Sequence, residues 1–174
     1  VVLISGTTVG GMDITEQYFE RMKTDDSLLY LPQSNECGKS TVEIAQMSGL
    51  QAECCTISTA CSSALNSIML GCEMLRRGEA DVVIAGGSEA MSKFHLNGFN
   101  TLMILDRERC RPFDDTRAGL NLGEGAAFVV LRRDSDIGAA EALSGGNVLA
   151  YIGGYGNRCD AFHQTATSEN GEGA

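Results

Sequence analysis

The chain has 174 residues, of which 43% are hydrophobic and 21% are charged, and its net charge is −10. This length is enough for one domain with a sizeable hydrophobic core. The isoelectric point of about 4.6 argues against nucleic acid as a partner, because phosphates attract basic surfaces. No apolar run approaches the roughly 18 residues of a membrane span, so we expect no membrane partner either.

The first predicted elements are a strand, a turn and a helix. Residues 1–6 (VVLISG) form an apolar, β-branched run that glycine ends, as is typical of a strand. Residues 6–11 (GTTVGG) lack the G-x-G-x-x-G spacing of a phosphate-binding loop, so we interpret them as a tight, closely packed turn. Residues 13–22 predict a helix, with Asp13 and Glu16 at the spacing of a capping box.

A second helix and a second strand follow. Ser40 and Glu43 open a short helix that Gly49 ends. Residues 53–59 (ECCTIST) are largely apolar and β-branched and predict a strand. Because the chain already reads as a strand at Val1 and ends in a loop-like segment, we expect it to be an internal piece of a longer protein.

Cys61 lies where the strand pattern changes to a helix pattern. A helix from Ser62 ends at Gly78, and residues 81–87 (DVVIAGG) predict a buried strand. We expect one apolar stripe to bury this helix: Ala64, Leu65, Ile68, Met69, Cys72 and Leu75. The N–H groups and dipole of a helix N-terminus favour a thiolate at Cys61 and can hold an oxyanion. From the residues alone, a nucleophile and a buried structural cysteine both remain open.

The last third of the chain gives weaker patterns. Residues 86–104 are weakly helical with a glycine interruption, and residues 110–125 form a turn-rich loop. Residues 126–133 predict a strand, residues 138–143 a short helix and residues 147–156 another strand. Since strands alternate with helices and no linker marks a second domain, the predicted class is α/β with a largely buried sheet.

Seven cysteines raise the alternatives of a disulfide scaffold and a metal site. They are residues 37, 54, 55, 61, 72, 110 and 159. Their number is odd, no C-x-x-C occurs, and His95 and His163 are the only histidines, so we expect neither disulfides nor zinc. We interpret most of these cysteines as small core residues in a reducing cytosol.

The segment STACSSALNSI followed by GEADVVIAGGSEAM resembles the nucleophile region of β-ketoacyl-acyl carrier protein synthases, the condensing enzymes with the thiolase fold. The resemblance extends through GTTVGGM, CRPFDDTRAGLNLGEGAAFVVL and GGYGNRCDAFHQTA, and covers nearly the whole chain in order. It implies an incomplete thiolase-like α/β fold: mostly the N-terminal half, with a mixed sheet and covering helices. Residues 1–174 would then be a partial ketosynthase domain.

The resemblance implies a 3-oxoacyl-[acyl carrier protein] synthase of fatty acid or polyketide biosynthesis. In this family the cysteine that matches Cys61 is acylated by a thioester, and malonyl-carrier protein then condenses with the acyl group as carbon dioxide leaves. The family's catalytic histidines and lysine lie in HGTGT and N-x-K-x-x-x-G-H segments, which this sequence lacks, so we expect the chain alone to be inactive in condensation: it should form no 3-oxoacyl product and at most accept an acyl group. The resemblance implies no metal and no cofactor, since phosphopantetheine arrives on the acyl carrier protein.

Six substrate-binding positions are also implied by the resemblance, although each could be an ordinary core residue. They are Val9, Ala60 and Phe99 in the acyl pocket, and Asp160, His163 and Thr165 in the loop that admits the pantetheine arm. Ala118 and Leu120 stand where the family commonly has an acidic and an aromatic residue, so the details of their loop differ from the family pattern.

The implied partners are acyl carrier protein and a second subunit, as a cytoplasmic homodimer or ketosynthase heterodimer. In the thiolase fold the strand that matches residues 54–59 pairs with its twin across the dimer, so we expect an edge strand in the monomer. One alternative is a non-catalytic subunit of the chain-length-factor kind, which replaces the nucleophile. Another is an unrelated cysteine hydrolase or redox protein, which needs a histidine base or a resolving cysteine. Acyl length and pathway (fatty acid, polyketide or aryl polyene) stay open.

Overall fold

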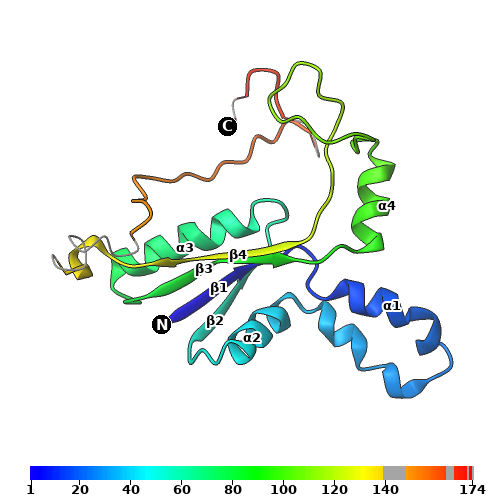
Figure 1. Ribbon diagram of the computed structural model, residues 1–174, viewed down its shortest axis with the longest axis horizontal. Coiled ribbons are helices and arrows are strands. Elements are labelled where there is room, and N and C mark those ends of the chain that lie inside the picture. Colours follow the sequence, from blue (N-terminus) through cyan, green and yellow to red (C-terminus); the bar gives the residue numbers. More distant parts are fainter. Residues whose placement is uncertain (139–147, 164–166, 172, 174) are drawn as a thin grey trace. The chain divides into compact units, whose positions relative to one another are not determined.

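The computed structural model describes residues 1–138, 148–163, 167–171 and 173 (Figure 1). These residues divide into two compact units, Val1–Asp134 and Ser135–Ala174. All four strands and all four α-helices of the described residues belong to the first unit. None of these helices is long and apolar enough to cross a membrane.

A four-stranded mixed sheet forms the centre of the first unit. Its strands are β1 (Val2–Gly6), β2 (Glu53–Ile57), β3 (Val83–Glu89) and β4 (Gly125–Leu131), in the spatial order β2-β1-β3-β4 (Figure 1). The first three strands are parallel, and β4 runs antiparallel to β3. The four strands predicted in this part of the sequence are confirmed, and β2 is an edge strand as expected for residues 54–59.

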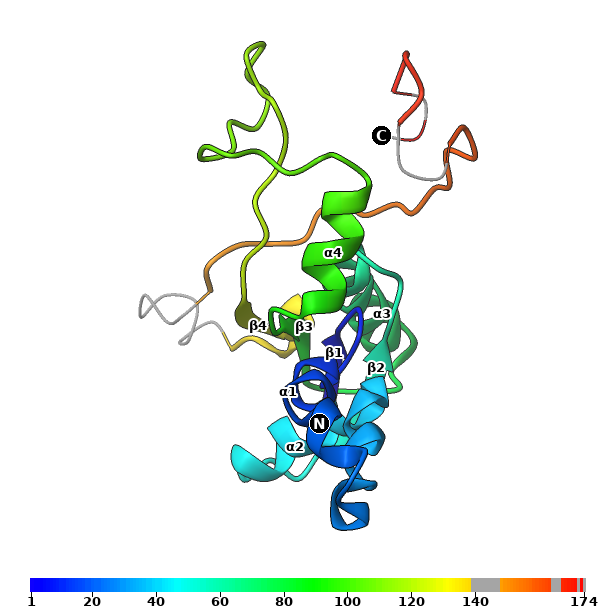
Figure 2. The same cartoon turned by 90° about the vertical axis from the view of Figure 1, so that its right-hand side faces the viewer.

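Helices cover both faces of this sheet. They are α1 (Met12–Met22), α2 (Cys37–Met47), α3 (Ser63–Arg77) and α4 (Lys93–Thr101), with short 3-10 turns at Asp26–Leu28, Leu31–Asn35 and Asp134–Asp136. Alternate residues of β2 point to opposite faces. Cys55 and Ile57 pack toward the core under α3, whereas the Thr56 hydroxyl lies 2.5 Å from the Thr41 hydroxyl of α2. Accordingly, α3 and α2 lie on opposite sides of the sheet (Figure 1 and Figure 2).

The stripe that buries α3 shares Leu75 with the predicted one and otherwise differs from it. Every fourth residue is buried: Ser63, Ser67, Gly71 and Leu75. Leu65, expected on the buried stripe, is 71% exposed. The helix lies so close to the sheet that a Cβ at Gly71 would come within 2.9 Å of the Val83 side chain. A small residue is therefore needed at Gly71 on the sheet-facing stripe, and a hydrophobicity pattern does not detect this requirement.

The predicted starts of α1 and α2 need correction, whereas the predicted ends at Gly49 and Gly78 are confirmed by positive φ angles there. No capping box forms in α1, because the Glu16 carboxylate accepts hydrogen bonds from the Lys93 and Phe94 amides, at 2.6 and 2.8 Å, and so caps α4. α2 begins at Cys37, before the predicted Ser40.

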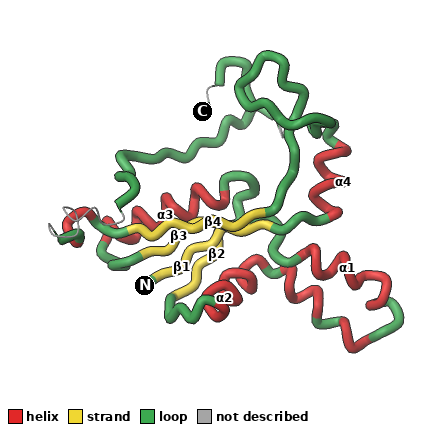
Figure 3. The backbone as a smooth tube through the Cα atoms, viewed as in Figure 1, coloured by secondary structure: helices red, strands yellow, loops and turns green. Residues whose placement is uncertain are grey.

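The final predicted elements are not part of the sheet. The strand prediction for residues 147–156 is wrong, because residues 148–156 have no regular structure. A strand needs a neighbour for its N–H and C=O groups, and no described strand pairs with these residues. Their apolar side chains are accordingly exposed, with Leu149 at 93%. The predicted helix at 138–143 lies outside the described residues apart from Gly138. The turn-rich loop is confirmed within the longer connection from α4 to β4 (Figure 3).

Candidate active site

Cys61 is exposed in the short turn that joins the end of β2 to the start of α3. Ala60, immediately before it, has φ of +52°, in the left-handed region that non-glycine residues rarely adopt. Ser62 then precedes the first helical residue, Ser63, one position later than predicted. Among the described residues no side chain caps this helix, and its first amide, that of Ser63, donates to the Ala60 carbonyl of the turn at 3.0 Å. The expected position of Cys61 at a strand-to-helix junction is confirmed.

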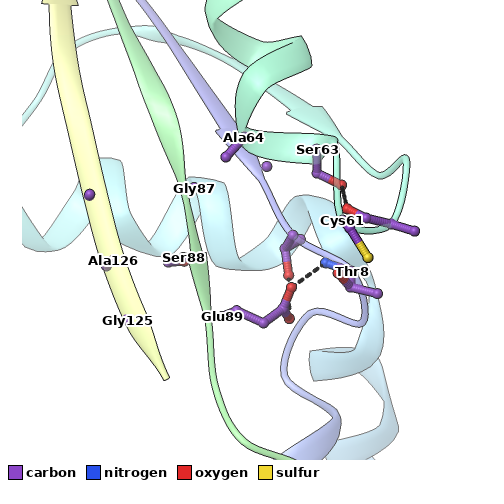
Figure 4. A pocket seen from close by; sticks show the side chains of 13 residues that line it. Thr8, Cys61, Ser63, Ala64, Gly87, Ser88, Glu89, Gly125 and Ala126 are labelled. Atoms are coloured by element: carbon purple, nitrogen blue, oxygen red, sulfur yellow. Dashed lines mark hydrogen bonds between the residues drawn. The ribbon is translucent and has the colours of Figure 1, made fainter. Parts of the chain in front are cut away.

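A pocket of about 500 Å³ opens beside Cys61. It lies where the parallel strands β1 and β3 end and the antiparallel β4 begins, so three strands contribute to its wall. Its lining comes from the Cys61 turn, from Thr7 and Thr8 after β1, and from residues 87–89 and 125–127 (Figure 4). We call it the Cys61 pocket. Most of these residues are small, so the exposed thiol has open space around it.

Two glycines allow the Cys61 turn to sit directly on the sheet. A Cβ at Gly6 would lie 2.5 Å from the Ser63 carbonyl carbon and 2.6 Å from the Ala64 nitrogen. A Cβ at Gly87 would lie 3.0 Å from the Ala64 side chain. The backbone of the first turn of α3 is therefore in contact with the ends of β1 and β3, which fixes the height of Cys61 above the sheet.

Hydroxyl groups hold the turn together from within. The Ser63 hydroxyl accepts a hydrogen bond from the Thr59 amide at 2.8 Å and donates one to the Ala60 carbonyl at 2.6 Å. The Ser62 hydroxyl donates to the Thr59 carbonyl at 2.8 Å, and the Asn66 side-chain Nδ2 donates to the Thr59 hydroxyl at 2.8 Å. The two residues before Cys61 are thus bonded to the first turns of α3.

Glu89 fixes the opposite wall of the pocket. Its carboxylate accepts hydrogen bonds from the Thr7 hydroxyl at 3.1 Å and the Thr8 amide at 2.6 Å (Figure 4). The Thr7 hydroxyl in turn accepts from the Gly10 amide at 3.2 Å, and Gly10 has φ of +60°. The GTTVGG segment is therefore a tight turn, as predicted.

The structure brings together only part of the predicted site. Ala60 lies beside Cys61 in the pocket, whereas Val9 and Phe99 are half-buried and outside its lining. Asp160 and His163 belong to the second unit, where the Asp160 carboxylate accepts a hydrogen bond from the Ser168 amide at 2.6 Å. Thr165 lies outside the described residues.

The other cysteines have different environments. All seven are free thiols, but Cys61 and Cys159 are the exposed ones and the remaining five are half-buried. Burial raises the pKa of the Cys72 thiol above its ordinary value. The interpretation of most cysteines as core residues is therefore only partly confirmed, because five of them are half-buried and none of the seven is fully buried.

Two residues of the site make hydrogen bonds that were not foreseen from the sequence. Ser63 and Glu89 both line the pocket, and each makes two hydrogen bonds to segments that carry or face Cys61. Ser63 could have been found from its N-terminal helix position, since serine there commonly bonds nearby backbone. No local signal identifies Glu89, because its partners Thr7 and Thr8 lie more than 80 residues away.

Comparison with known proteins gives three kinds of match. Residues 2–137 match the family described as "Beta-ketoacyl synthase, N-terminal domain". Nodulation protein E of Rhizobium meliloti (strain 1021) is 31% identical over 175 residues, which cover 95% of this chain and 41% of that protein. The 3-oxoacyl-[acyl-carrier-protein] synthase 2 of Staphylococcus aureus is 38% identical over 121 residues, which cover 66% of this chain and 29% of that protein. The chain thus spans less than half the length of these relatives.

The solved structures that superimpose on this chain also contain ketosynthases, and the chain again covers only part of each matched chain. "The ishigamide ketosynthase/chain length factor" superimposes with a TM-score of 0.82 and 29% identity, over 98% of this chain and 42% of that one. A ketosynthase in complex with its chain length factor from Xenorhabdus doucetiae gives a TM-score of 0.65 and 29% identity, over 76% and 34% of the two chains. The prediction of a thiolase-like fold, present mostly as its N-terminal part, is confirmed.

Proposed function

The chain belongs to the β-ketoacyl synthase family, and from this premise we propose that Cys61 is the acyl-accepting nucleophile of a 3-oxoacyl-[acyl carrier protein] synthase. The main support for the proposal is the position of Cys61. Its side chain is exposed beside a pocket, it directly follows Ala60 with its left-handed φ, and it precedes α3, which no described side chain caps. Such a position exposes a nucleophile to a substrate and to helix amides at the same time.

The proposed first step is a thioester exchange. The Cys61 thiolate attacks the acyl thioester carbonyl, the new C–S bond forms, and the carrier's thiol leaves with a proton. The oxyanion of the tetrahedral intermediate needs hydrogen-bond donors. The Ser63 amide is used by the Ala60 carbonyl, so the donors that this chain offers are the next amides in the first turn of α3. Residues that could polarise the malonyl group are not part of the Cys61 pocket, whose lining contains no histidine or lysine.

The proposed second step is a decarboxylative condensation. The malonyl thioester loses carbon dioxide, and the resulting carbanion attacks the acyl group on Cys61. The bond to sulfur breaks, which regenerates the Cys61 thiolate and releases a 3-oxoacyl thioester two carbons longer. In this proposal the acyl carrier protein is a substrate-bearing partner that brings its own phosphopantetheine. Val9, Phe99, Asp160, His163 and Thr165 remain candidates for acyl and pantetheine contacts.

The proposed assembly is a dimer through β2. This strand is the edge of the sheet and leaves N–H and C=O groups for a partner strand. The partner is a second copy of this protein or a related ketosynthase-family subunit. The second possibility is supported by the two superimposed structures, which contain ketosynthases with chain length factors.

The same structures favour one alternative function, a chain-length-factor-like subunit without catalysis. The presence of Cys61 argues against it, since such subunits replace the nucleophile. Alkylation with iodoacetamide or cerulenin, mapped by mass spectrometry, separates the two functions. The synthase proposal expects Cys61 to react first of the seven cysteines. Faster reaction at Cys54, Cys110 or the exposed Cys159 would contradict it.

A further inference from the structure

We propose that Ser63 is a positioning residue for Cys61: its buried hydroxyl holds the preceding residues in the strained turn that presents the thiol. The inference rests on the proposed role of Cys61 as nucleophile. Ser63 itself does not touch the substrate in this account, because its hydroxyl is used by the turn.

The contacts of Ser63 are concentrated on the two residues before Cys61. Its side chain is 4% exposed, although Ser62 and Ala64 on either side of it are exposed. The hydroxyl accepts from the Thr59 amide at 2.8 Å and donates to the Ala60 carbonyl at 2.6 Å. The hydroxyl proton and one lone pair are thereby used, so the hydroxyl bridges the peptide group before Thr59 and the peptide group after Ala60.

Ala60 explains why a bridge is needed. Its φ of +52° places its Cβ close to the backbone, a conformation that L-residues other than glycine adopt rarely and at a cost. Strained conformations persist only where the surroundings hold them. The Ala60 carbonyl, a group that must turn if Ala60 relaxes, accepts from the Ser63 hydroxyl in addition to the Ser63 amide, which lies at 3.0 Å. The bond from the Thr59 amide to the same hydroxyl holds the segment just before Ala60 in place. Relaxation of Ala60 would rotate Cys61 away from the pocket.

The next serine on the same stripe provides the matched comparison. Ser67 is one helical turn later, fully buried, and its hydroxyl donates to the Ala64 carbonyl at 2.6 Å and the Gly86 carbonyl at 2.7 Å. It therefore ties α3 to β3, and it is not part of the Cys61 pocket. Removal of either hydroxyl destabilises a buried hydrogen-bonded site, but of the two only removal of the Ser63 hydroxyl takes hydrogen bonds away from the turn before the thiol.

The test measures the iodoacetamide alkylation rate of Cys61 by peptide mass spectrometry in the full chain, with exposed Cys159 as the internal reference. S63A should lower the Cys61 rate about tenfold, the size expected for the loss of two buried hydrogen bonds, with Cys159 unchanged. S67A should leave the Cys61 to Cys159 ratio at its wild-type value. An S63A chain with an unchanged ratio would overturn the proposal.

A double-mutant cycle with A60G tests the strain directly. Glycine adopts positive φ without the Cβ penalty, so S63A should have little effect on the Cys61 rate in the A60G chain. A tenfold loss in both backgrounds would overturn the proposal. If S63A does not fold but the double variant does, rescue by glycine supports it, and failure of both to fold overturns it. A wild-type chain in which Cys61 is not the first cysteine to react would instead contradict the proposed function.

Discussion

Gly6→Ala should displace Cys61 without touching it. Gly6 is the last residue of β1, and the backbone of Ser63 and Ala64 lies directly above it. A new Cβ would lie 2.5 Å from the Ser63 carbonyl carbon, whereas ordinary contact begins at 3.4 Å, so the deficit is 3.4 − 2.5 = 0.9 Å. The obstructing atoms are backbone, so no side-chain rotation can relieve the overlap, and the first turn of α3 has to move.

The expected effect of Gly6→Ala has two parts. Overpacking should cost about 1–3 kcal/mol in the free energy of unfolding. Displacement of a reacting group by about 1 Å can cost on the order of 100-fold in rate, so the reactivity of Cys61 toward an acyl thioester should fall by about 10- to 100-fold. Urea denaturation gives the first quantity, and acylation of Cys61 followed by peptide mass spectrometry gives the second.

Gly71→Ala is the matched control for this prediction. Its Cβ would meet the Val83 and Leu131 side chains at 2.9 and 3.0 Å, which can adjust, and Gly71 lies two helical turns beyond Ser63 on the same buried stripe. Alanine also gains about 1 kcal/mol of helix propensity, which offsets part of the overpacking. Gly71→Ala should change stability and leave the acylation rate of Cys61 unaltered. If Gly6→Ala also leaves that rate unaltered, the turn is not positioned by the sheet.

Three further predictions concern other parts of the chain. Ile57→Asp should lower the free energy of unfolding, measured by urea denaturation, by at least about 2 kcal/mol, because Ile57 packs against the core. A variant that is stable and only loses self-association, measured by light scattering, would instead place this side chain at the dimer interface. Glu16→Ala should lower the free energy of unfolding by about 1 kcal/mol and speed hydrogen exchange at the Lys93 and Phe94 amides. The control Glu20→Ala removes an exposed ion pair with Lys23 and should leave this exchange unchanged. Because burial raises the pKa of Cys72, its thiol stays protonated to higher pH than a free cysteine thiol, and its alkylation rate should level off at a higher pH than that of free cysteine. A rate that levels off at the same or a lower pH would contradict this.

Local chemistry made much of the first unit predictable. β-Branched runs bounded by glycine coincide with the strands, and Gly49 and Gly78 end helices because both residues adopt positive φ. The junction at Cys61 was visible as a change from strand to helix periodicity. These features depend on neighbouring residues, so a sequence pattern contains them.

The errors arose where distant segments decide the outcome. Glu16 caps α4 because α1 and α4 are neighbours in space. The two hydrogen-bonded residues Glu16 and Lys93 are 77 residues apart in the sequence, so no local pattern reveals the contact. The buried stripe of α3 is set by its distance from the sheet, which excludes Leu65 and selects Gly71. Residues 148–156 have a strand-like composition but pair with no described strand. Ser63 appeared to be an ordinary helix-start serine until its partners Thr59 and Ala60 were visible.

Acyl transfer to Cys61 tests the central claim most directly. The wild-type chain and Cys61→Ala should be incubated with a short acyl thioester of N-acetylcysteamine and digested for peptide mass spectrometry. We expect one acyl group on the wild-type peptide that contains Cys61, and none on any cysteine of the variant. An acyl group on Cys159 or another cysteine, at a rate that Cys61→Ala does not change, would contradict the assignment of Cys61 as the nucleophile.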